Sequence, residues 1–351
     1  MTTANNQKRL VDEYVGILEP LFSLESVNAF ELVCTLLRVG GDRSTGWDPF
    51  QESREFLDDV SVLARVNLPK DRFPNTERTR MRMALASYDR VVGMQAPYQV
   101  IANLLRVKGG MTYVDDPFFH LKMGAMEKSG KRKPIARDIA LGPKRKIDEI
   151  KRLAELVDCP RIGEAFDDFY YPDIHHAINL SDYVLDGGEL RMLRRPAPAK
   201  KTPVDTSVAG YEVLTEMVAR AHAYFLAFIR LEAAARKRYK RYKGKCVPYD
   251  PNLKGLLELL IDDEGDLCGI KVHWPNKTES VFQRKGVRCE STNVTFDADG
   301  SVNFFVGEYF DDHSQQSPLV PKGRALEYTL AEGSAEPPGW PAGLEKTSRS
   351  Q

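Results

Sequence analysis

The sequence has little of what marks several common classes of protein. Its five cysteines are widely spaced and form no C-x-x-C pair, so we expect neither a disulfide framework nor a structural zinc site. No apolar run approaches the roughly 18 residues that a membrane-spanning helix needs. The first residues, Met1 to Lys8, lack the apolar segment of a signal peptide. We therefore expect a cytoplasmic protein that has no membrane partner.

An excess of charge of either sign is also absent. Lys and Arg together number 50, Asp and Glu together number 50, and the formal net charge is zero. This balance excludes a globally basic nucleic-acid coat but leaves room for local basic patches. With 42% hydrophobic and 28% charged residues among 351, the composition is that of a folded globular chain, long enough for two or three domains.

Motifs for phosphate, dinucleotide and metal-hydrolase chemistry are missing. The chain has no P-loop, no Rossmann fingerprint, no G-x-S-x-G and no H-E-x-x-H. The run Asp297–Glu308 is similar to a calcium loop, but Val302 stands where such a loop needs glycine, and we interpret the run as a β-turn. The acidic pair before His313 has no further ligand at a supporting spacing. We expect no cofactor and no metal.

Apolar residues in the first two-thirds of the chain recur at the helical period. One run has the i, i+3, i+4, i+7 spacing of a single helix face: Val11, Tyr14, Val15 and Leu18. Asn75 is expected to cap a long helix, and Pro97 to kink or divide it. The expected helices cover about residues 11–18, 30–37, 49–66, 75–109, 147–157, 161–183 and 208–242.

The pattern changes near residue 246 to short alternating runs. Runs at 256–261 and 268–274 flank a turn, and runs at 293–296 and 302–306 predict a hairpin. The expected fold class is therefore α+β, mainly an α-helical bundle followed by a small antiparallel β unit. The expected domains are the bundle at 1–245, the β unit at 246–331 and a flexible tail at 332–351.

One stretch, residues 170–194, reads YYPDIHHAINLSDYVLDGGELRMLR. It resembles the last helix and following turn of bacterial helical proteins related to the HEPN superfamily. Four features are in register with that group: Ala177, Ser181, Tyr183 and Leu190–Arg191. The resemblance extends over about residues 75–195. It implies a HEPN-like helical bundle, a homodimer with RNA in its cleft, and a role in antiviral defence.

The catalytic residues of that superfamily are not in place. Active HEPN ribonucleases use a closely spaced Arg and His, the Arg to stabilise phosphate charge and the His to transfer a proton. Here His175 stands at the Arg position and Leu180 at the His position. Because leucine transfers no proton, the resemblance implies a pseudo-active site without catalytic function. Its residues would be His175, His176, Asn179, Leu180, Ser181 and Tyr183.

The two adjacent histidines leave an alternative open. Imidazoles titrate near neutral pH and can act as base and acid in phosphodiester cleavage. Neighbouring residues of a helix point about 100° apart, so the two rings of one chain diverge, although a dimer could bring two copies of His175 together. The second hypothesis is therefore an active ribonuclease or toxin that uses His175 and His176.

Two basic stretches are candidate nucleic-acid contacts. Between Arg230 and Lys245, eight basic residues accompany one acid, and tyrosines are interleaved, so phosphate contact and base stacking are both available. A second basic region runs from Lys128 to Arg152. The candidate residues are Arg236, Lys237, Arg238, Tyr239, Lys240, Arg241, Lys243, Lys131, Arg132 and Lys133. A solvated helix end, or a docking site for an acidic protein, would show the same pattern.

These observations give three hypotheses of different classes. The first is a non-catalytic HEPN-like protein that binds RNA or a protein partner as a homodimer. The second is the active ribonuclease. The third is a structural assembly module that binds no nucleic acid. Salt-dependent RNA binding separates the first hypothesis from the third, because phosphate contacts weaken steeply as salt rises.

Overall fold

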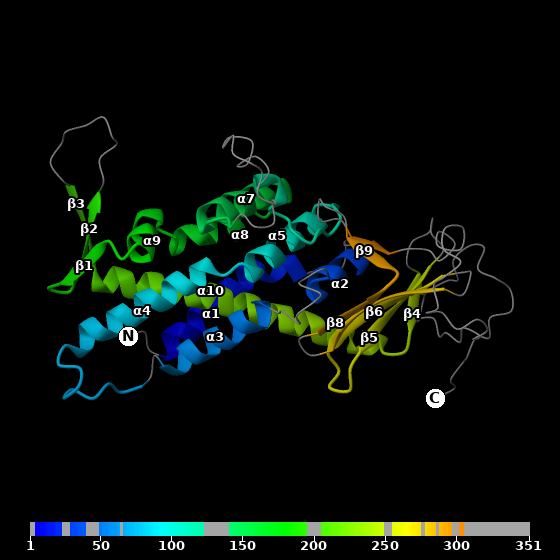
Figure 1. Ribbon diagram of the computed structural model, residues 1–351, viewed down its shortest axis with the longest axis horizontal. Coiled ribbons are helices and arrows are strands. Elements are labelled where there is room, and N and C mark those ends of the chain that lie inside the picture. Colours follow the sequence, from blue (N-terminus) through cyan, green and yellow to red (C-terminus); the bar gives the residue numbers. More distant parts are fainter. Residues whose placement is uncertain are drawn as a thin grey trace. The chain divides into compact units, whose positions relative to one another are not determined.

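The computed structural model describes residues 4–22, 29–39, 49–63, 66–122, 140–194, 205–248, 255–274, 278–285, 288–296 and 302–304. Over these residues the predicted α+β fold is confirmed, with helices in most of the first part of the chain and antiparallel strands in most of the rest (Figure 1). No helix in this part of the chain is both long and apolar enough to cross a membrane. The basic loop at 128–133 and the tail after 332 lie outside the described residues.

The chain divides into two compact units, each built from more than one segment of the sequence. Unit 1 comprises Met1–Phe22, Pro49–Leu105 and His120–Leu231. Unit 2 comprises Ser23–Asp48, Arg106–Phe119 and Glu232–Gln351. The strongly apolar helix α2 (Ala29–Leu37) packs against a strand of the C-terminal sheet, and this packing places it in unit 2. Helical periodicity predicts that such a helix exists, but not which surface it covers.

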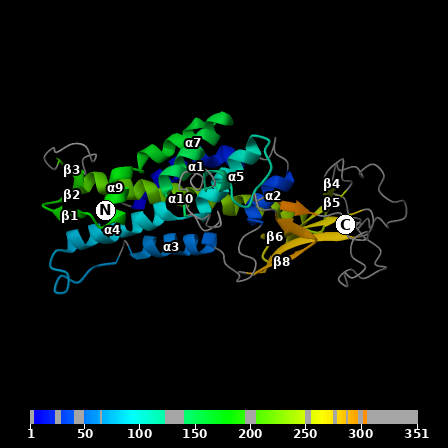
Figure 2. The same ribbon diagram turned by 45° about the horizontal axis from the view of Figure 1, so that its top comes forward.

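Unit 1 is a bundle of helices with one small sheet (Figure 2). Its helical elements are α1 (Ala4–Leu18), η1 (Glu19–Phe22), α3 (Pro49–Leu63), α4 (Thr76–Gly93), α5 (Ala96–Lys108), α7 (Pro143–Leu156), α8 (Pro160–Glu164), η3 (Ala165–Asp168), α9 (Pro172–Asn179) and α10 (Tyr211–Arg238). The last residues of α5 and α10 belong to unit 2. Five rings from α5, η3, its following turn and α10 form the centre of the bundle, with centroids 4.8 to 6.3 Å apart: Tyr98, Phe166, Phe169, Tyr224 and Phe225.

Local sequence signals set the ends of the central helices. The Asn75 side chain accepts a hydrogen bond from the Arg78 backbone N–H at 3.0 Å, which confirms the predicted cap of α4. The chain then forms two helices on either side of Met94 and Gln95. Pro97 lies in the first turn of α5, where its missing N–H leaves no hydrogen bond unmade.

The small sheet of unit 1 connects α9 to α10. Its strands β1 (Tyr183–Asp186), β2 (Glu189–Arg194) and β3 (Asp205–Gly210) pair antiparallel in that order. Gly187 and Gly188 both have positive φ, at 57° and 83°, as a two-residue hairpin turn requires. The expected helix start at Val208 was wrong, because residues 205–210 pair with β2 and α10 begins at Tyr211.

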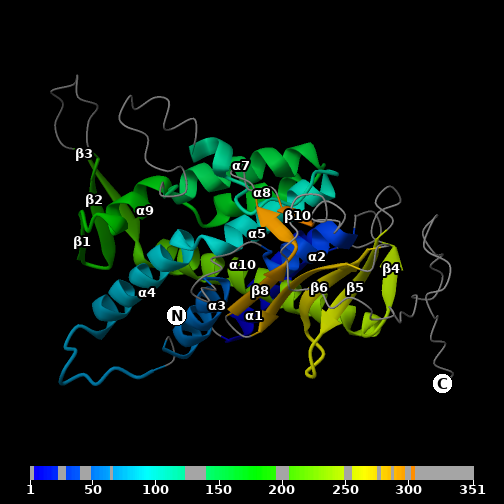
Figure 3. The same ribbon diagram turned by 45° about the vertical axis from the view of Figure 1, so that its right-hand side comes forward.

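Unit 2 contains α2, η4 (Tyr239–Tyr242) and a five-stranded antiparallel sheet (Figure 3). In sheet order the strands are β4 (Cys246–Pro248), β5 (Leu256–Ile261), β6 (Leu267–His273), β7 (Glu279–Lys285) and β8 (Arg288–Thr292). The predicted hairpin is also present, as β9 (Val294–Phe296) and β10 (Val302–Phe304).

The two faces of this sheet differ in character. One face is apolar and buried, and consists of Leu257, Leu259, Ile270, Val272 and Phe282. The opposite face is mostly polar and includes Cys246, Glu258, Lys271, His273 and Glu279. Alternation along each strand therefore gathers several ionisable groups on one surface.

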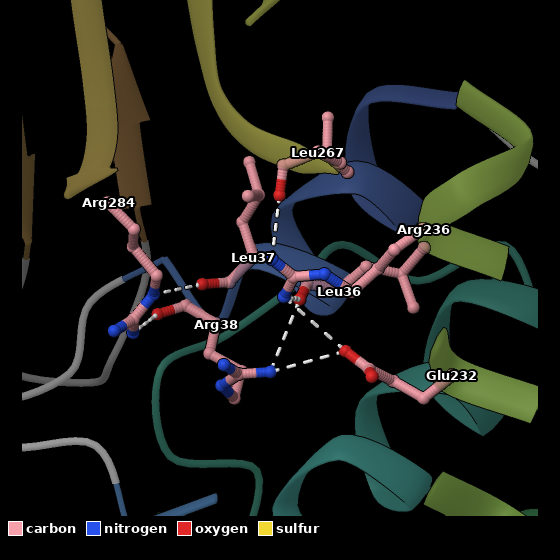
Figure 4. A network of polar contacts seen from close by, with 7 residues as sticks. All are labelled: Leu36, Leu37, Arg38, Glu232, Arg236, Leu267 and Arg284. Carbon is pink, nitrogen blue, oxygen red and sulfur yellow. Dashed lines mark hydrogen bonds and ion pairs between the residues drawn. The ribbon is translucent and has the colours of Figure 1, made fainter. Parts of the chain in front are cut away.

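Arginine side chains hold the C-terminal end of α2 (Figure 4). Arg284 donates from Nε to the Leu37 carbonyl at 2.6 Å and from Nη2 to the Arg38 carbonyl at 2.8 Å. Arg236 donates to the Leu36 carbonyl at 3.2 Å. These carbonyls have no partner within the helix, so the arginines complete their hydrogen bonding and complement the negative end of the helix dipole.

Candidate functional site

The end of α9 turns the chain back toward α4. Ser181 adopts a left-handed conformation with φ 54°, and its N–H donates to the Ile178 carbonyl at 3.0 Å. The Asp182 N–H donates to the Ala177 carbonyl at 2.8 Å. Together these two bonds form a Schellman cap, which ends the helix at Asn179 with Leu180 as its C-cap and starts β1 in a new direction. The cap is therefore what places Ser181 and Tyr183 beside α4.

A pocket of about 250 Å³ lies between α4 and this turn. The residues that line it are Arg78, Arg82, Ser181, Tyr183, Val184 and Leu185. Arg78 and Arg82 are four residues apart on α4, so their side chains project from the same face of the helix, one turn apart. Two guanidinium groups and two hydroxyl groups thus line one small cavity.

The two guanidinium groups are not engaged elsewhere in the described part of the chain. Neither has a hydrogen bond or an ion pair with another described residue, and Arg78 Nε is buried without a partner. A buried N–H group that lacks a partner is costly, and an anion in the pocket would supply one. The pocket is therefore able to bind an anion with existing, unused donors.

The charge around this pocket is mixed. Burial raises the pKa of Tyr211, the nearby Arg78 and Arg82 lower it, and Glu77 and Asp186 raise it. Asp186 lies 3.7 Å from Arg191, which also pairs with Glu189. These carboxylates lower the positive potential around the two arginines, so the positive region is confined to the pocket itself.

His175 does not line this pocket. Its Nε2 lies 3.4 Å from Asp89 Oδ1 on α4, and its ring packs near the rings of Tyr88 and Tyr170. The side chain is only 12% exposed. Burial lowers the pKa of His175, while the Asp89 carboxylate opposes that change. His175 is therefore a packed group with one carboxylate neighbour.

The six predicted pseudo-active-site residues therefore separate into three groups. Ser181 and Tyr183 line the pocket, and His175 packs inward. The other three, His176, Asn179 and Leu180, are exposed to solvent. Sequence reasoning missed Arg78 and Arg82, although their i, i+4 spacing just after the Asn75 cap is visible in the sequence.

The basic stretch at the end of α10 is only partly exposed. Arg236 is occupied within unit 2, donating to the Leu267 carbonyl at 2.7 Å, and Tyr239 is 4% exposed. Five candidate contacts remain exposed on this segment: Lys237, Arg238, Lys240, Arg241 and Lys243. The other three candidates, Lys131, Arg132 and Lys133, lie outside the described residues.

A second pocket in unit 1, of about 490 Å³, has the opposite charge. Its acidic lining residues are Asp167, Asp168, Glu212 and Glu216. Arg220 lies among them, within 3.8 Å of carboxylates on Glu13, Asp168 and Glu216. Because its one arginine is already paired, this pocket would repel a phosphate, and the pocket at Arg78 and Arg82 remains the better anion site.

Comparisons with known proteins return nothing similar: no family model matches the chain, no curated protein matches its sequence, and no solved structure matches its fold. The likeness of residues 170–194 to HEPN proteins consequently remains a prediction from the sequence.

Proposed function

We propose that the protein binds RNA without cleaving it, and that the pocket at Arg78 and Arg82 holds a backbone phosphate. The observation that carries this proposal is the pair of guanidinium groups, engaged by no other described residue, beside two hydroxyls in one cavity. Guanidinium groups present planar pairs of N–H donors that match phosphate oxygens, and hydroxyls add further donors. The stretch that resembles HEPN proteins supplies both hydroxyls, from Ser181 and Tyr183.

The pocket lining supports binding without cleavage. Phosphodiester cleavage near neutral pH needs a base and an acid within hydrogen-bond reach of the reacting oxygens. The described residues that line the pocket include no His, Asp or Glu. His175 packs toward Asp89, and His176 is exposed on the neighbouring helix position. The arginines can stabilise phosphate charge, but no lining imidazole or carboxylate is present to move a proton.

The first test removes both arginines. In the Arg78→Ala/Arg82→Ala variant we expect the affinity for a labelled single-stranded RNA to fall roughly 30-fold at low salt, since two phosphate-binding charges at about 1 kcal/mol each contribute about 2 kcal/mol. The slope of log affinity against log salt should become shallower by roughly 0.7 for each phosphate that the variant no longer neutralises. Fluorescence anisotropy at several salt concentrations measures both quantities.

The matched control is Arg54→Ala/Arg161→Ala, which removes the same charge from two exposed positions of unit 1. Its RNA affinity should stay close to that of the parent protein. Equal losses in both variants would show that only general charge matters. No binding of the parent protein at low salt would exclude RNA and favour a protein partner.

The same samples test the absence of cleavage. We expect the RNA to remain intact after long incubation with the parent protein, as followed by gel electrophoresis. Cleavage that disappears in the His175→Ala variant would contradict the proposal and support the active ribonuclease instead. Cleavage that persists in this variant would point to a contaminating nuclease, which repurification of the parent protein would remove.

A further inference from the structure

Three side chains of metal-binding type meet on the polar face of the five-stranded sheet in unit 2. Cys246 comes from β4, Glu258 from β5 and His273 from β6. Cys246 stands directly opposite Glu258 in the pairing of β4 with β5. Glu258 stands opposite Lys271, and His273, two residues further along β6, points to the same face. The register of three strands therefore brings these groups together.

The ligand atoms of these residues are close enough to share one ion. The Cys246 Sγ, a Glu258 carboxylate oxygen and a His273 ring nitrogen all lie within 4.8 Å of one another. Glu258 Oε2 is 2.8 Å from His273 Nε2. Around tetrahedral zinc, with bonds of about 2.0 to 2.3 Å, ligand atoms stand roughly 3.3 to 3.8 Å apart. Small side-chain rotations are enough to reach that arrangement.

Two of the three ligands are buried, and His273 has a second carboxylate neighbour. Cys246 is 3% exposed and His273 is 6% exposed. The other ring nitrogen of His273, Nδ1, lies 3.1 Å from Glu279 Oε1 on β7. Glu279 is itself paired with Lys271, whose Nζ lies 3.6 Å from Oε2. A carboxylate on the far nitrogen of a histidine is the usual support of a metal-bound imidazole, because it fixes the tautomer and the ring orientation.

We propose that Cys246, Glu258 and His273 form a zinc site, with His273 bound through Nε2 and a water molecule in the fourth position. A thiolate, a carboxylate and a neutral imidazole are ligands that zinc accepts, and the two negative charges balance the ion. Binding displaces the thiol proton of Cys246 and any proton on Nε2, and both protons leave to solvent. Nδ1 keeps its proton, which the nearby Glu279 carboxylate stabilises.

The test measures metal binding by the full-length protein directly. After removal of metal with a chelator, we expect one equivalent of Zn²⁺ to bind, and Co²⁺ in its place to give a thiolate-to-metal charge-transfer band and the intense visible bands of tetrahedral cobalt. Cys246→Ser should abolish the charge-transfer band. The matched control is Cys268→Ser, which removes a half-buried cysteine of β6 outside the cluster and should leave the spectrum unchanged.

A second variant keeps the test decisive if Cys246→Ser does not fold. Glu279→Gln leaves all three ligands in place and should weaken zinc affinity by about 10- to 100-fold in a chelator competition, the usual effect of losing such a support. Glu290→Gln on the edge strand β8 is the control and should not change the affinity. The proposal would be overturned if the parent protein gave no thiolate-to-cobalt band, or if that band persisted in Cys246→Ser. Equal zinc affinities of Glu279→Gln and Glu290→Gln would also overturn it.

Discussion

Replacing Lys146 with methionine is expected to raise the free energy of unfolding at pH 6 by about 2 to 4 kcal/mol. Lys146 lies on α7 and has no exposed surface. Its Nζ donates to the Met94 carbonyl at 3.2 Å and lies 4.5 Å from the centre of the Tyr98 ring. Burial, with a smaller contribution from Lys122, lowers the pKa of Lys146 to about 7. The folded protein therefore holds a buried ammonium group at pH 6.

The sign of this effect follows from the two pKa values. The unfolded chain keeps the ordinary lysine pKa of 10.5, whereas the folded chain has a value of about 7. Between these two pKa values the unfolded state binds more protons than the folded state, so the free energy of unfolding rises with pH. Below about pH 7 both states carry the proton, and the folded protein bears the whole cost of burying the ammonium group. At about 1.4 kcal/mol for each pKa unit, this cost is roughly 5 kcal/mol. In the variant the Met94 carbonyl loses its hydrogen-bond donor, and this loss cancels about 1 to 3 kcal/mol of the stability gained by removing the ammonium group.

Urea unfolding followed by circular dichroism at pH 6, 8 and 10 measures this prediction. The advantage of Lys146→Met should be largest at pH 6 and shrink toward pH 10. Lys144→Met is the matched control, because Lys144 lies on the same helix, is 64% exposed and makes a surface pair with Asp148. Its effect should stay below about 1 kcal/mol. An advantage that does not depend on pH, or a loss of stability at pH 6, would contradict the interpretation.

Lys146 also shows what a charge count can and cannot predict. Its position between Lys128 and Arg152 makes it one member of a basic region, and a count of charges treats all members alike. Yet Lys146 also lies four residues before Ile150 and seven before Leu153, which belong to the apolar stripe of α7. That spacing predicts the inward direction of the side chain. The buried ammonium was therefore predictable from its helix face, though not from its charge.

The helices were predictable because their signals are local. Asn75 caps its own helix, and Pro97 limits the helix in which it stands. The strands β7 and β8 carry weaker signals, since the only apolar residues of β7 are the adjacent Val281 and Phe282, and β8 contains almost no apolar residue. Their strand conformation depends on pairing with neighbours, which no short window of sequence contains.

The residues of the candidate sites also differ in whether a local stretch of sequence could predict them. Ser181 and Tyr183 were identified because they belong to one continuous stretch. Arg78 and Arg82 lie far from that stretch in sequence, and only the packing of α9 on α4 brings them to it. The three residues around His273 are not separated by the short, fixed spacings of a metal-binding sequence motif. They come together only because three paired strands place them on one face. Long-range contacts of this kind need the folded chain.

Replacing Glu232 with alanine is expected to lower the free energy of unfolding of unit 2 by about 3 to 5 kcal/mol. The side chain of Glu232 is 4% exposed, and its Oε1 lies 3.3 Å from Arg38 Nη1 and 3.5 Å from Arg236 Nη1 (Figure 4). The two arginine side chains are 17% and 19% exposed. Without the carboxylate, two poorly solvated guanidinium groups lose their shared counter-charge.

Tryptophan fluorescence during urea unfolding reports on this unit. Trp274 belongs to unit 2 and is fully buried, with its Nε1 donating to Ser280 Oγ at 2.9 Å. Glu264→Ala, in an exposed turn of the same unit, is the matched control and should change stability by less than about 0.5 kcal/mol. A loss of less than about 1 kcal/mol for Glu232→Ala would mean that the carbonyl contacts hold the arginines without the carboxylate.

A third variant, Glu232→Gln, separates charge from hydrogen bonding in this network. Glutamine keeps a carbonyl oxygen that can accept from both arginines but removes the negative charge. Arg236 and Arg284 already donate to backbone carbonyls of Leu267, Leu36, Leu37 and Arg38. Those neutral acceptors satisfy N–H groups but leave the positive charges uncompensated, so we expect Glu232→Gln to lose most of the stability that Glu232→Ala loses. Near-parental stability of Glu232→Gln would show instead that the acceptor, and not its charge, is what Arg38 and Arg236 require.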